Sequence, residues 1–290
     1  MKKRPRIVLI GNTGSWHVTE LLRRCDRWAV GQVVSWPELA ALIGVGKERF
    51  IPEAVEQADC LLIRGMPTGT LEQVIGRMDV LGRLAAQGRR VLNQPLALEI
   101  AIDKYLATAR LAAAGLPVVP SALVQSAADL DRIQQELGNS LIAKPLFGSN
   151  GRGLCQLVKA ADPPELLRSQ GAFLVQQQIP HEGWDVRILV VGERTYAMKR
   201  VAPAGEWRTN IALGGEPVPF AAPADWTDLA RKAAATVGAE IAGVDLLPAA
   251  DGSLWLLEVN AVPGWRALQR VVSDDITAAV LELAVGPAGN

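Results

Sequence analysis

The sequence has little that would support disulfide, zinc or redox chemistry. It contains three cysteines and two histidines in 290 residues. Cys25, Cys60 and Cys155 lie far apart and form no CxxC pair, so we expect reduced, mostly buried thiols in a cytoplasmic protein. His17 and His181 show no metal-binding spacing, which argues against a zinc site.

Long apolar runs and a charge imbalance are also lacking. No run of about 18 apolar residues is present, so we expect no membrane span. The apolar run after the basic start is too short for a signal peptide and predicts a first strand at residues 6–10. Thirty Lys and Arg balance thirty Asp and Glu, which gives no argument for a nucleic-acid or membrane partner. The GNTG turn that follows lacks a dinucleotide fingerprint and is interpreted as an ordinary strand-to-helix turn, which disfavours an NAD-dependent dehydrogenase.

The most informative segment is a predicted hairpin near the C-terminal end. The stretches AGVDLLPAA and SLWLLEVN flank an Asp-Gly pair at 251–252 and are typical of strands. Asp-Gly favours a two-residue type I′ turn, because both central positions require positive φ. The register set by such a turn places Asp245 directly opposite Glu258.

These two acids are the basis of a predicted metal site. Directly opposed carboxylates lie about 5 Å apart at Cβ, and their repulsion destabilises a sheet unless something positive lies between them. Asn260 shares the face of Glu258, because side chains in a strand alternate with period two. The all-oxygen set Asp245, Glu258 and Asn260 suits Mg²⁺ or Mn²⁺. The alternative is a one-residue register slip, which puts the acids on opposite faces.

The remaining pattern divides the chain into three units. Residues 1–96 alternate strand-like and helix-like segments, which predicts a small parallel α/β domain. Residues 97–172 predict a small α+β unit, with Lys104 in the first turn of one helix and Ser126 capping another. Residues 173–290 are mostly strands and include the acidic hairpin.

A glycine-rich segment in the second unit is a candidate phosphate-binding loop. Lys144 ends an apolar strand and is followed by PLFGSNGRG. Glycines let backbone N–H groups approach phosphate oxygens, and lysine supplies a point charge. Such a loop is also free to move as a lid. The alternative is an ordinary hairpin turn. The candidate nucleotide ligands here are Lys144, Gly148, Ser149, Gly151 and Gly153.

Polar residues on the later strands extend this site. Residues 176–178 are three glutamines that precede Ile179 at a strand end. Amide side chains at such a place suit the recognition of adenine. The alternative is that these glutamines are solvated, which is common at strand ends. Asp185 and Arg187 share one strand face because they are two residues apart. Further cations and an amide follow. Either they bind phosphate groups, as phosphoryl transfer requires, or they belong to a solvated surface. They are Lys199, Arg200, Arg208 and Asn210.

These segments resemble the ATP-grasp superfamily and, within it, the RimK-type amino-acid ligases. The matching pieces, in the family's order, are IDKYLATARLAAAGLP, LIAKPLFGSNGRG, FLVQQQI, WDVRILVVGE, EWRTNIALGG, and AGVDLLP with LLEVNAVPGW. They cover roughly residues 101–270, and the EVNxxPG ending is a specific signal. The resemblance implies an α/β (α+β) ATP-grasp fold. Its parts would be a parallel pre-grasp domain at 1–96, a central lid domain at 97–172 and an antiparallel-sheet domain at 173–290.

The resemblance also implies roles for the residues above. Lys104 and Lys144 would hold ATP phosphates, and Arg208 would meet the γ-phosphate. The adenine and ribose side would comprise Gln176, Gln177, Gln178, Ile179 and Asp185, with Lys199 also placed at the nucleotide. Asp245, Glu258 and Asn260 would bind two Mg²⁺ ions. Relatives often have glutamate at the position of Gln177, so altered nucleotide contacts are expected there.

The reaction implied is the formation of an amide. The γ-phosphate of ATP is transferred to a carboxylate, and an amine then attacks the acylphosphate. The segments RGMPTGTLEQVIGRMD and EWRTNIALGG look closest to relatives that add α-linked glutamate to a pterin- or furan-containing one-carbon cofactor. Glutamate is therefore the expected amine. The candidate substrate residues are Arg64, Arg187, Arg200 and Asn210.

Several alternatives stay open at this level. Arg64 matches an arginine that faces the cleft in RimK-like proteins, but a surface arginine at a strand end has the same pattern. The enzyme could ligate another amino acid, act in lysine biosynthesis or modify a ribosomal protein. A non-catalytic nucleotide-binding protein is a further alternative. Whether the chain forms a homo-oligomer also stays open.

Overall fold

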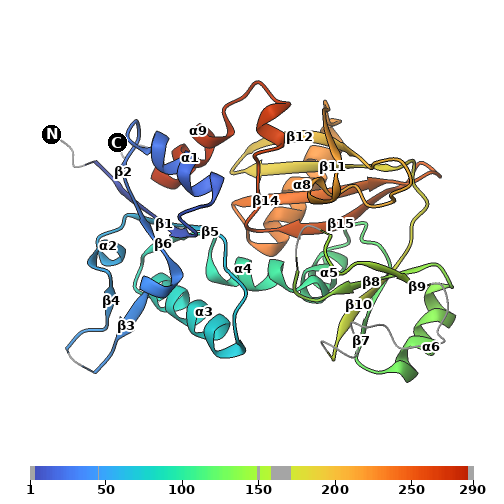
Figure 1. The fold of residues 1–290 in the computed structure, drawn as a ribbon, viewed down its shortest axis with the longest axis horizontal. Coiled ribbons are helices and arrows are strands. Elements are labelled where there is room, and N and C mark those ends of the chain that lie inside the picture. The colour runs from blue at the N-terminus through green and yellow to red at the C-terminus, as the bar shows by residue number, and fades with distance from the viewer. Residues whose placement is uncertain (1–3, 45, 149–150, 158–170, 287–290) are drawn as a thin grey trace.

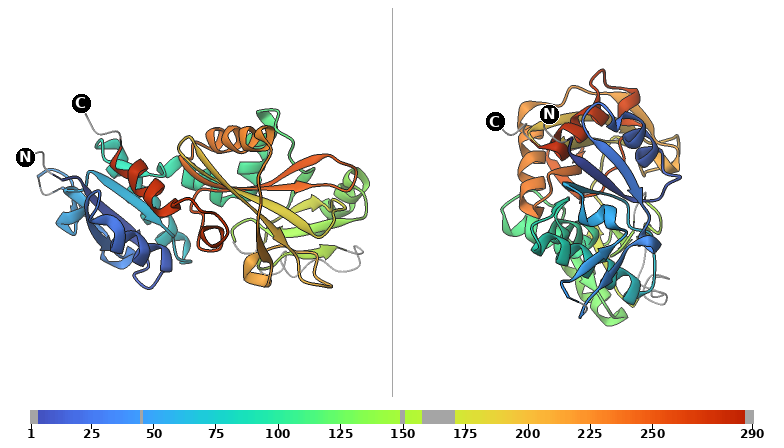
Figure 2. Two further views of the ribbon diagram at one scale, coloured as in Figure 1. Left: turned by 90° about the horizontal axis from the view of Figure 1, so that it is seen from above. Right: turned by 90° about the vertical axis from the view of Figure 1, so that its left-hand side faces the viewer.

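The structure of the chain is a computed structural model that describes residues 4–44, 46–148, 151–157 and 171–286. It is a mixed α/β fold in which a parallel sheet at one end stands beside two antiparallel sheets at the other (Figures 1 and 2). Within these residues no helix is both long and apolar enough to cross a membrane.

The N-terminal unit is the parallel α/β domain that the sequence predicts. Its sheet has the order β2-β1-β5-β6, formed by β1 (Arg6–Gly11), β2 (Val30–Val34), β5 (Cys60–Arg64) and β6 (Arg90–Leu92). The connecting helices are α1 (Trp16–Cys25), α2 (Glu53–Glu56) and α3 (Leu71–Ala86). All five residues of β5 are buried, as expected for a central strand covered on both faces.

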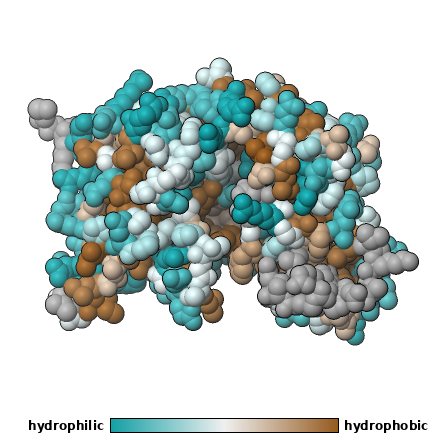
Figure 3. Space-filling view, in the orientation of Figure 1, coloured by the Kyte–Doolittle hydropathy of each residue, from teal (hydrophilic) through white to brown (hydrophobic). Residues whose placement is uncertain are grey.

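The sequence did not predict a small hairpin on this unit. It is formed by β3 (Ala40–Leu42) and β4 (Arg49–Ile51), which follow the 3₁₀ turn η1 (Trp36–Glu38). Hydrophobic residues gather over this hairpin at one corner of the molecular surface (Figure 3), where Leu42, Ile43 and Ile51 are exposed.

The central unit is a four-stranded antiparallel sheet with one covering helix. Its order is β7-β10-β8-β9, formed by β7 (Ser121–Val124), β8 (Leu141–Pro145), β9 (Cys155–Leu157) and β10 (Phe173–Gln177). The helices α4 (Pro95–Ile102) and α5 (Lys104–Ala113) lead into it, and α6 (Ala127–Leu137) is capped by Ser126. Because β10 pairs with β7 and β8, residues 173–177 belong to this sheet and not to the third unit.

The third unit is a five-stranded sheet in the order β13-β12-β11-β14-β15. Its strands are β11 (Trp184–Val191), β12 (Arg194–Val201), β13 (Glu216–Pro219), β14 (Ile241–Pro248) and β15 (Leu254–Asn260). The remaining elements are α8 (Ala224–Val237), α9 (Ile276–Val285) and the 3₁₀ turns η2 (Ile211–Leu213) and η3 (Leu268–Arg270). The apolar side chains of α8 pack on one face of the sheet. Residues of α9 cover one part of the other face, and the polar residues of the site lie on the rest of it.

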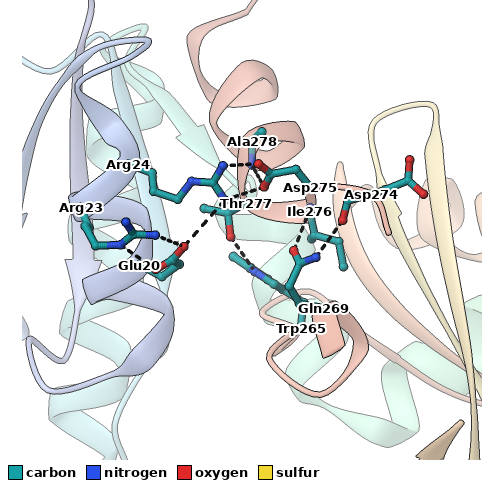
Figure 4. Close-up of polar contacts among 10 residues, drawn as sticks. All are labelled: Glu20, Arg23, Arg24, Trp265, Gln269, Asp274, Asp275, Ile276, Thr277 and Ala278. Atoms are coloured by element: carbon teal, nitrogen blue, oxygen red, sulfur yellow. Dashed lines mark hydrogen bonds and ion pairs between the residues drawn. The ribbon is translucent and has the colours of Figure 1, made fainter. Parts of the chain in front are cut away.

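The last helix, α9, returns to the N-terminal unit. It packs against α1, and the guanidinium of Arg24 donates two hydrogen bonds to the carboxylate of Asp275 (Figure 4). The indole N–H of Trp265 donates to Thr277 Oγ1 at 3.2 Å. The Arg24–Asp275 contact attaches the N-terminal unit to the segment that follows β15, and the Trp265–Thr277 bond joins two parts of that segment.

Asn93 makes a second attachment, directly after β6. Its side chain is 2% exposed, and its amide nitrogen donates to the carbonyl oxygens of Ile241 at 2.7 Å and Ala261 at 2.6 Å. Its amide oxygen accepts from the backbone N–H groups of Glu240 and Ile241. One buried side chain thus joins the parallel sheet to the start of β14 and the end of β15.

We expect Asn93→Ala to lower the free energy of unfolding by about 3 kcal/mol or more, because four hydrogen bonds are lost and buried backbone groups lose their partners. Urea denaturation measures this change. Gln94→Ala is the matched control, because Gln94 is exposed, and it should cost no more than about 0.5 kcal/mol. Equal losses for the two variants would contradict the attachment.

Candidate functional site

The hairpin of β14 and β15 pairs Asp245 with Glu258, as the sequence predicts. The predicted two-residue turn is nevertheless wrong. Pro248 pairs with Leu254, and the N–H of Ala249 donates to the carbonyl of Ser253 at 2.8 Å, so the loop is one residue longer. The register at the turn is therefore shifted by one residue from the prediction.

A β-bulge corrects this shift before the acids are reached. Leu246 pairs with Leu256, whereas Asp245 pairs with Glu258, so Leu257 is the extra residue. Leu257 and Glu258 both line the cleft described below, whereas Leu256 is buried in the core. A bulge can redirect a side chain in this way. It places Glu258 on the same face as Asp245.

The cleft lies between the central sheet and the face of the third sheet that is opposite α8. It encloses about 870 Å³, part of it open to solvent. Fourteen predicted site residues line it: Lys104, Lys144, Gly148, Gly151, Gln176, Gln177, Gln178, Ile179, Asp185, Arg200, Arg208, Asn210, Asp245 and Glu258.

Two lysines, Lys104 and Lys144, place positive charge next to the glycine-rich segment. Lys144, on β8, donates a hydrogen bond to the side-chain oxygen of Gln176 on the neighbouring β10. The ammonium of Lys104 donates to the carbonyl of Gly148 at 2.7 Å. Burial, together with the nearby Lys104, lowers the pKa of Lys144 to about 8, although the acids Glu258 and Asp245 act in the opposite direction.

A buried ion network holds Asp245. Arg187 donates two hydrogen bonds of 2.6 Å to its carboxylate, and Arg200 lies 2.9 Å from the same group. Arg200 also donates two hydrogen bonds to Asp185, at 2.7 and 2.5 Å. Burial alone would raise the pKa of Asp245, but the two guanidinium groups outweigh it and lower that pKa. The repulsion expected between opposed acids is thus reduced by arginines.

The residues present fit a divalent cation at this place. Glu258 lines the cleft and, within the described residues, accepts no hydrogen bond and forms no ion pair. Asp245 carries oxygen ligands on the same face. Asn260, at the end of the same strand as Glu258, does not line the cleft. The amide oxygen of Asn260 accepts from the N–H of Val262 at 2.8 Å. Carboxylate and amide oxygens are the hard ligands that magnesium and manganese prefer.

Two of the predicted nucleotide residues lie outside the cleft. Lys199 is adjacent to Arg200 on β12 and therefore points to the opposite face, where its ammonium lies 4.0 Å from the ring centre of Trp184. Gly153 does not line the cleft. Ser149 lies outside the described residues.

Two of the predicted substrate residues also differ from the expectation. Arg187 lies beside Asp245 on the neighbouring strand β11 and does not line the cleft. Arg64 was expected to face the cleft. It is instead buried against Pro263 and Trp265, at the end of β5 in the parallel sheet. The cause in both cases is a partner distant in the sequence, which the local pattern does not contain.

The glycine at position 151 is required by its surroundings. Its φ is +70°, and a Cβ there would lie 2.4 Å from the side-chain oxygen of Asn210. The glycine-rich segment can therefore approach the loop that carries Arg208, whose guanidinium pairs with Glu206 at 2.7 Å.

The sequence reasoning missed several residues of the cleft. They are Ile142, Pro145, Arg152, Leu154, His181, Trp207, Thr209, Leu247 and Leu257. Arg152 stands within the glycine-rich motif, and Trp207 and Thr209 flank Arg208, so nearness to a recognised motif could have identified these three. Leu257 could not be found, because its orientation depends on the bulge.

Comparison with known proteins shows the family of the chain. Residues 101–284, more than half of the chain, match the model of the RimK-like ATP-grasp domain. The chain belongs to the RimK-like ATP-grasp family. A relative from Methanosarcina acetivorans named tetrahydromethanopterin:alpha-L-glutamate ligase is 33% identical over 72% of this chain and 74% of its own length. A ribosomal protein bS6--L-glutamate ligase from Salmonella paratyphi B is 35% identical over 67% of each chain.

Solved structures support the fold of the whole chain. The ATP-grasp ligase PsnB complexed with a minimal precursor has a TM-score of 0.76 at 21% identity, covering 98% of this chain and 99% of that one. A RimK domain protein from Sphaerobacter thermophilus has a TM-score of 0.72 at 20% identity, covering 97% of this chain and all of that one. The predicted family and fold are confirmed, and the RimK-like chain is an ATP-dependent ligase.

The pKa of Lys144 gives a test by pH. Phosphate binds the charged ammonium, so above about pH 8 nucleotide binding must take up a proton, and affinity should fall by up to about tenfold per pH unit. Calorimetry of Mg²⁺-ADP between about pH 7 and about pH 9 measures this fall. Lys144→Met should remove the dependence, and Lys232→Met, at an exposed lysine, should keep it. A wild-type affinity that is constant over this range would contradict the role of Lys144.

Proposed function

We propose that this RimK-like ligase joins L-glutamate to a carboxylate of a small-molecule or cofactor acceptor, with ATP as the energy source and an acylphosphate as the intermediate. The observation that carries the proposal is the pairing of Asp245 with Glu258 on one face of a cleft that Lys104 and Lys144 also line. Opposed acids and nearby lysines in one cleft suit a nucleotide with bound magnesium.

The chain's residues have distinct roles in this proposal. Lys104 and Lys144 bind phosphate oxygens, and Arg208 neutralises charge on the transferred phosphoryl group. Asp245, Glu258 and Asn260 would hold two Mg²⁺ or Mn²⁺ ions, which would neutralise charge on the phosphate oxygens of the nucleotide. Gln176, Gln177 and neighbouring residues of the strand end contact the nucleoside.

The proposed reaction also requires that water is kept away from the acylphosphate, because an acylphosphate hydrolyses readily. The glycine-rich segment contributes Gly148 and Gly151 to the lining of the cleft. Hydrogen bonding of Lys104 to the carbonyl of Gly148 links this segment to α5. We assign to it the covering of the reacting groups during phosphoryl transfer.

The names of the relatives support glutamate as the amine. Both the relative named as a tetrahydromethanopterin ligase and the one named for ribosomal protein bS6 are L-glutamate ligases. Their acceptors differ, so the choice of a one-carbon cofactor rests on the relative that is 33% identical. Transfer of glutamate to a ribosomal protein is the second candidate, favoured by the relative that is 35% identical.

The test is ADP release by the purified protein with ATP, Mg²⁺ and each amino acid, in the presence of tetrahydromethanopterin, ribosomal protein bS6 or no acceptor. We expect release to require glutamate and one acceptor, and the acceptor mass to increase by one or more glutamyl residues. Glu258→Gln should lower kcat by at least about 100-fold. Glu216→Gln, at an exposed position of β13, should leave kcat unchanged.

Two results would contradict the proposal. One is ADP release that depends on another amino acid and not on glutamate. The other is full activity of Glu258→Gln, which would remove the assigned role of the paired acids.

A further inference from the structure

Among the described residues, Glu206 is the only hydrogen-bond partner of the Arg208 guanidinium. Arg208 Nε donates to Glu206 Oε1 at 3.0 Å, and Arg208 Nη2 donates to Oε2 at 2.7 Å. Such a bidentate pair fixes the plane of the guanidinium as well as its distance from the carboxylate. Nη1 makes no hydrogen bond within the described residues. Arg208 therefore has N–H donors left for an anion in the cleft that it lines.

The same carboxylate also fixes the backbone that carries Arg208. Residues 206–210 form no helix or strand. The backbone N–H groups of Trp207 and Arg208 both donate to Glu206 Oε1 at 2.9 Å. Glu206 is itself held by a turn, in which its N–H donates to the carbonyl of Pro203 at 3.0 Å. Four hydrogen bonds to one carboxylate thus hold the main chain and the guanidinium of Arg208 in one arrangement.

Glu206 stands outside the cleft, whereas Trp207 and Arg208 line it. The hydrogen bond from the Arg208 side chain, followed by that from its backbone N–H, lowers the pKa of Glu206 to about 2, so the carboxylate stays charged at neutral pH. A negative charge beside a phosphate site is unfavourable by itself, because like charges repel. The hydrogen bonds to Arg208 offer a role that compensates for this repulsion.

We infer that Glu206 is a positioning residue of the ligase, which holds the Arg208 guanidinium so that its remaining N–H groups meet the phosphoryl group that ATP transfers. An arginine side chain is long and flexible, so holding it in advance reduces the entropy lost when the nucleotide binds. Donors that are fixed before the reaction stabilise developing charge most effectively. This inference rests on the proposed function, because the role of Arg208 at the transferred phosphoryl group is taken from it.

Two other roles of Glu206 make different predictions. If Glu206 only folds the segment around Trp207, its loss disturbs the binding of ADP and of ATP alike, and it does so even in the absence of the Arg208 guanidinium. If its charge instead withholds Arg208 from the nucleotide, its neutralisation strengthens the binding of the γ-phosphate. Glu206→Gln separates these roles. Glutamine can still accept the two backbone N–H groups through its side-chain oxygen, but its amide nitrogen cannot accept from Arg208 Nη2.

The test is calorimetry with Mg²⁺-ADP and with Mg²⁺-AMPPNP, a non-hydrolysable analogue of ATP, because the ratio of the two Kd values measures binding of the γ-phosphate. We expect Arg208→Gln to lower the preference for AMPPNP by roughly 10- to 100-fold, as for the loss of charge-assisted hydrogen bonds. Glu206→Gln should lower it by roughly tenfold and change the Kd of Mg²⁺-ADP by less than about twofold. Glu216→Gln, at an exposed position of β13, is the control and should keep the wild-type preference.

The variant that carries both Glu206→Gln and Arg208→Gln completes a double-mutant cycle. A positioning residue acts only through Arg208, so the double variant should match Arg208→Gln alone. Additive losses overturn the inference, as does a preference for AMPPNP that is unchanged or higher in Glu206→Gln. A wild-type preference in Arg208→Gln overturns the role of Arg208 and this inference together. None of these titrations needs glutamate, an acceptor or turnover, so failure of the glutamate ligation test leaves their result readable.

Discussion

The opposition of Asp245 and Glu258 across β14 and β15 is the constraint on which the rest of the site depends. Two carboxylates on neighbouring strands repel each other, so the sheet can hold them only if positive charge is supplied. Arg187 and Arg200 supply it to Asp245, and Asp185 in turn pairs with Arg200. Glu258 has no such partner among the described residues, and its position in the cleft is consistent with a cation that binds together with the nucleotide.

The position of these acids is determined by contacts with the parallel sheet as well as by the hairpin. Asn93 bonds to Ile241 and Ala261, next to the beginning of β14 and the end of β15. Arg64 bonds to Pro263 a few residues further along. The helix α9 then packs on α1. The N-terminal unit thus supports the strands that carry the acids.

Much of the fold could be predicted because its signals are local. The alternation of segments predicted the parallel sheet, and the branched stretches around Asp251 predicted the hairpin. The pairing of Asp245 with Glu258 was predicted correctly although the turn was not, because the longer loop and the extra Leu257 shift the register in opposite directions. The shift at the longer loop follows from turn geometry, and the shift at Leu257 follows from packing. Neither shift can be predicted from the sequence alone.

The errors in the site have two physical causes. Lys199 and Arg200 were both assigned to the site, although adjacent residues of a strand point to opposite faces, so alternation alone would have excluded one of them. Arg187 and Arg64 could not be placed, because their partners Asp245 and Pro263 are distant in the sequence.

The most direct measurement is anomalous diffraction from crystals grown with ADP and Mn²⁺. The account predicts an anomalous peak within bonding distance of carboxylate oxygens from both Asp245 and Glu258. A nucleotide that is well ordered in the cleft with no such peak, and with Asp245 bonded only to its arginines, would contradict it.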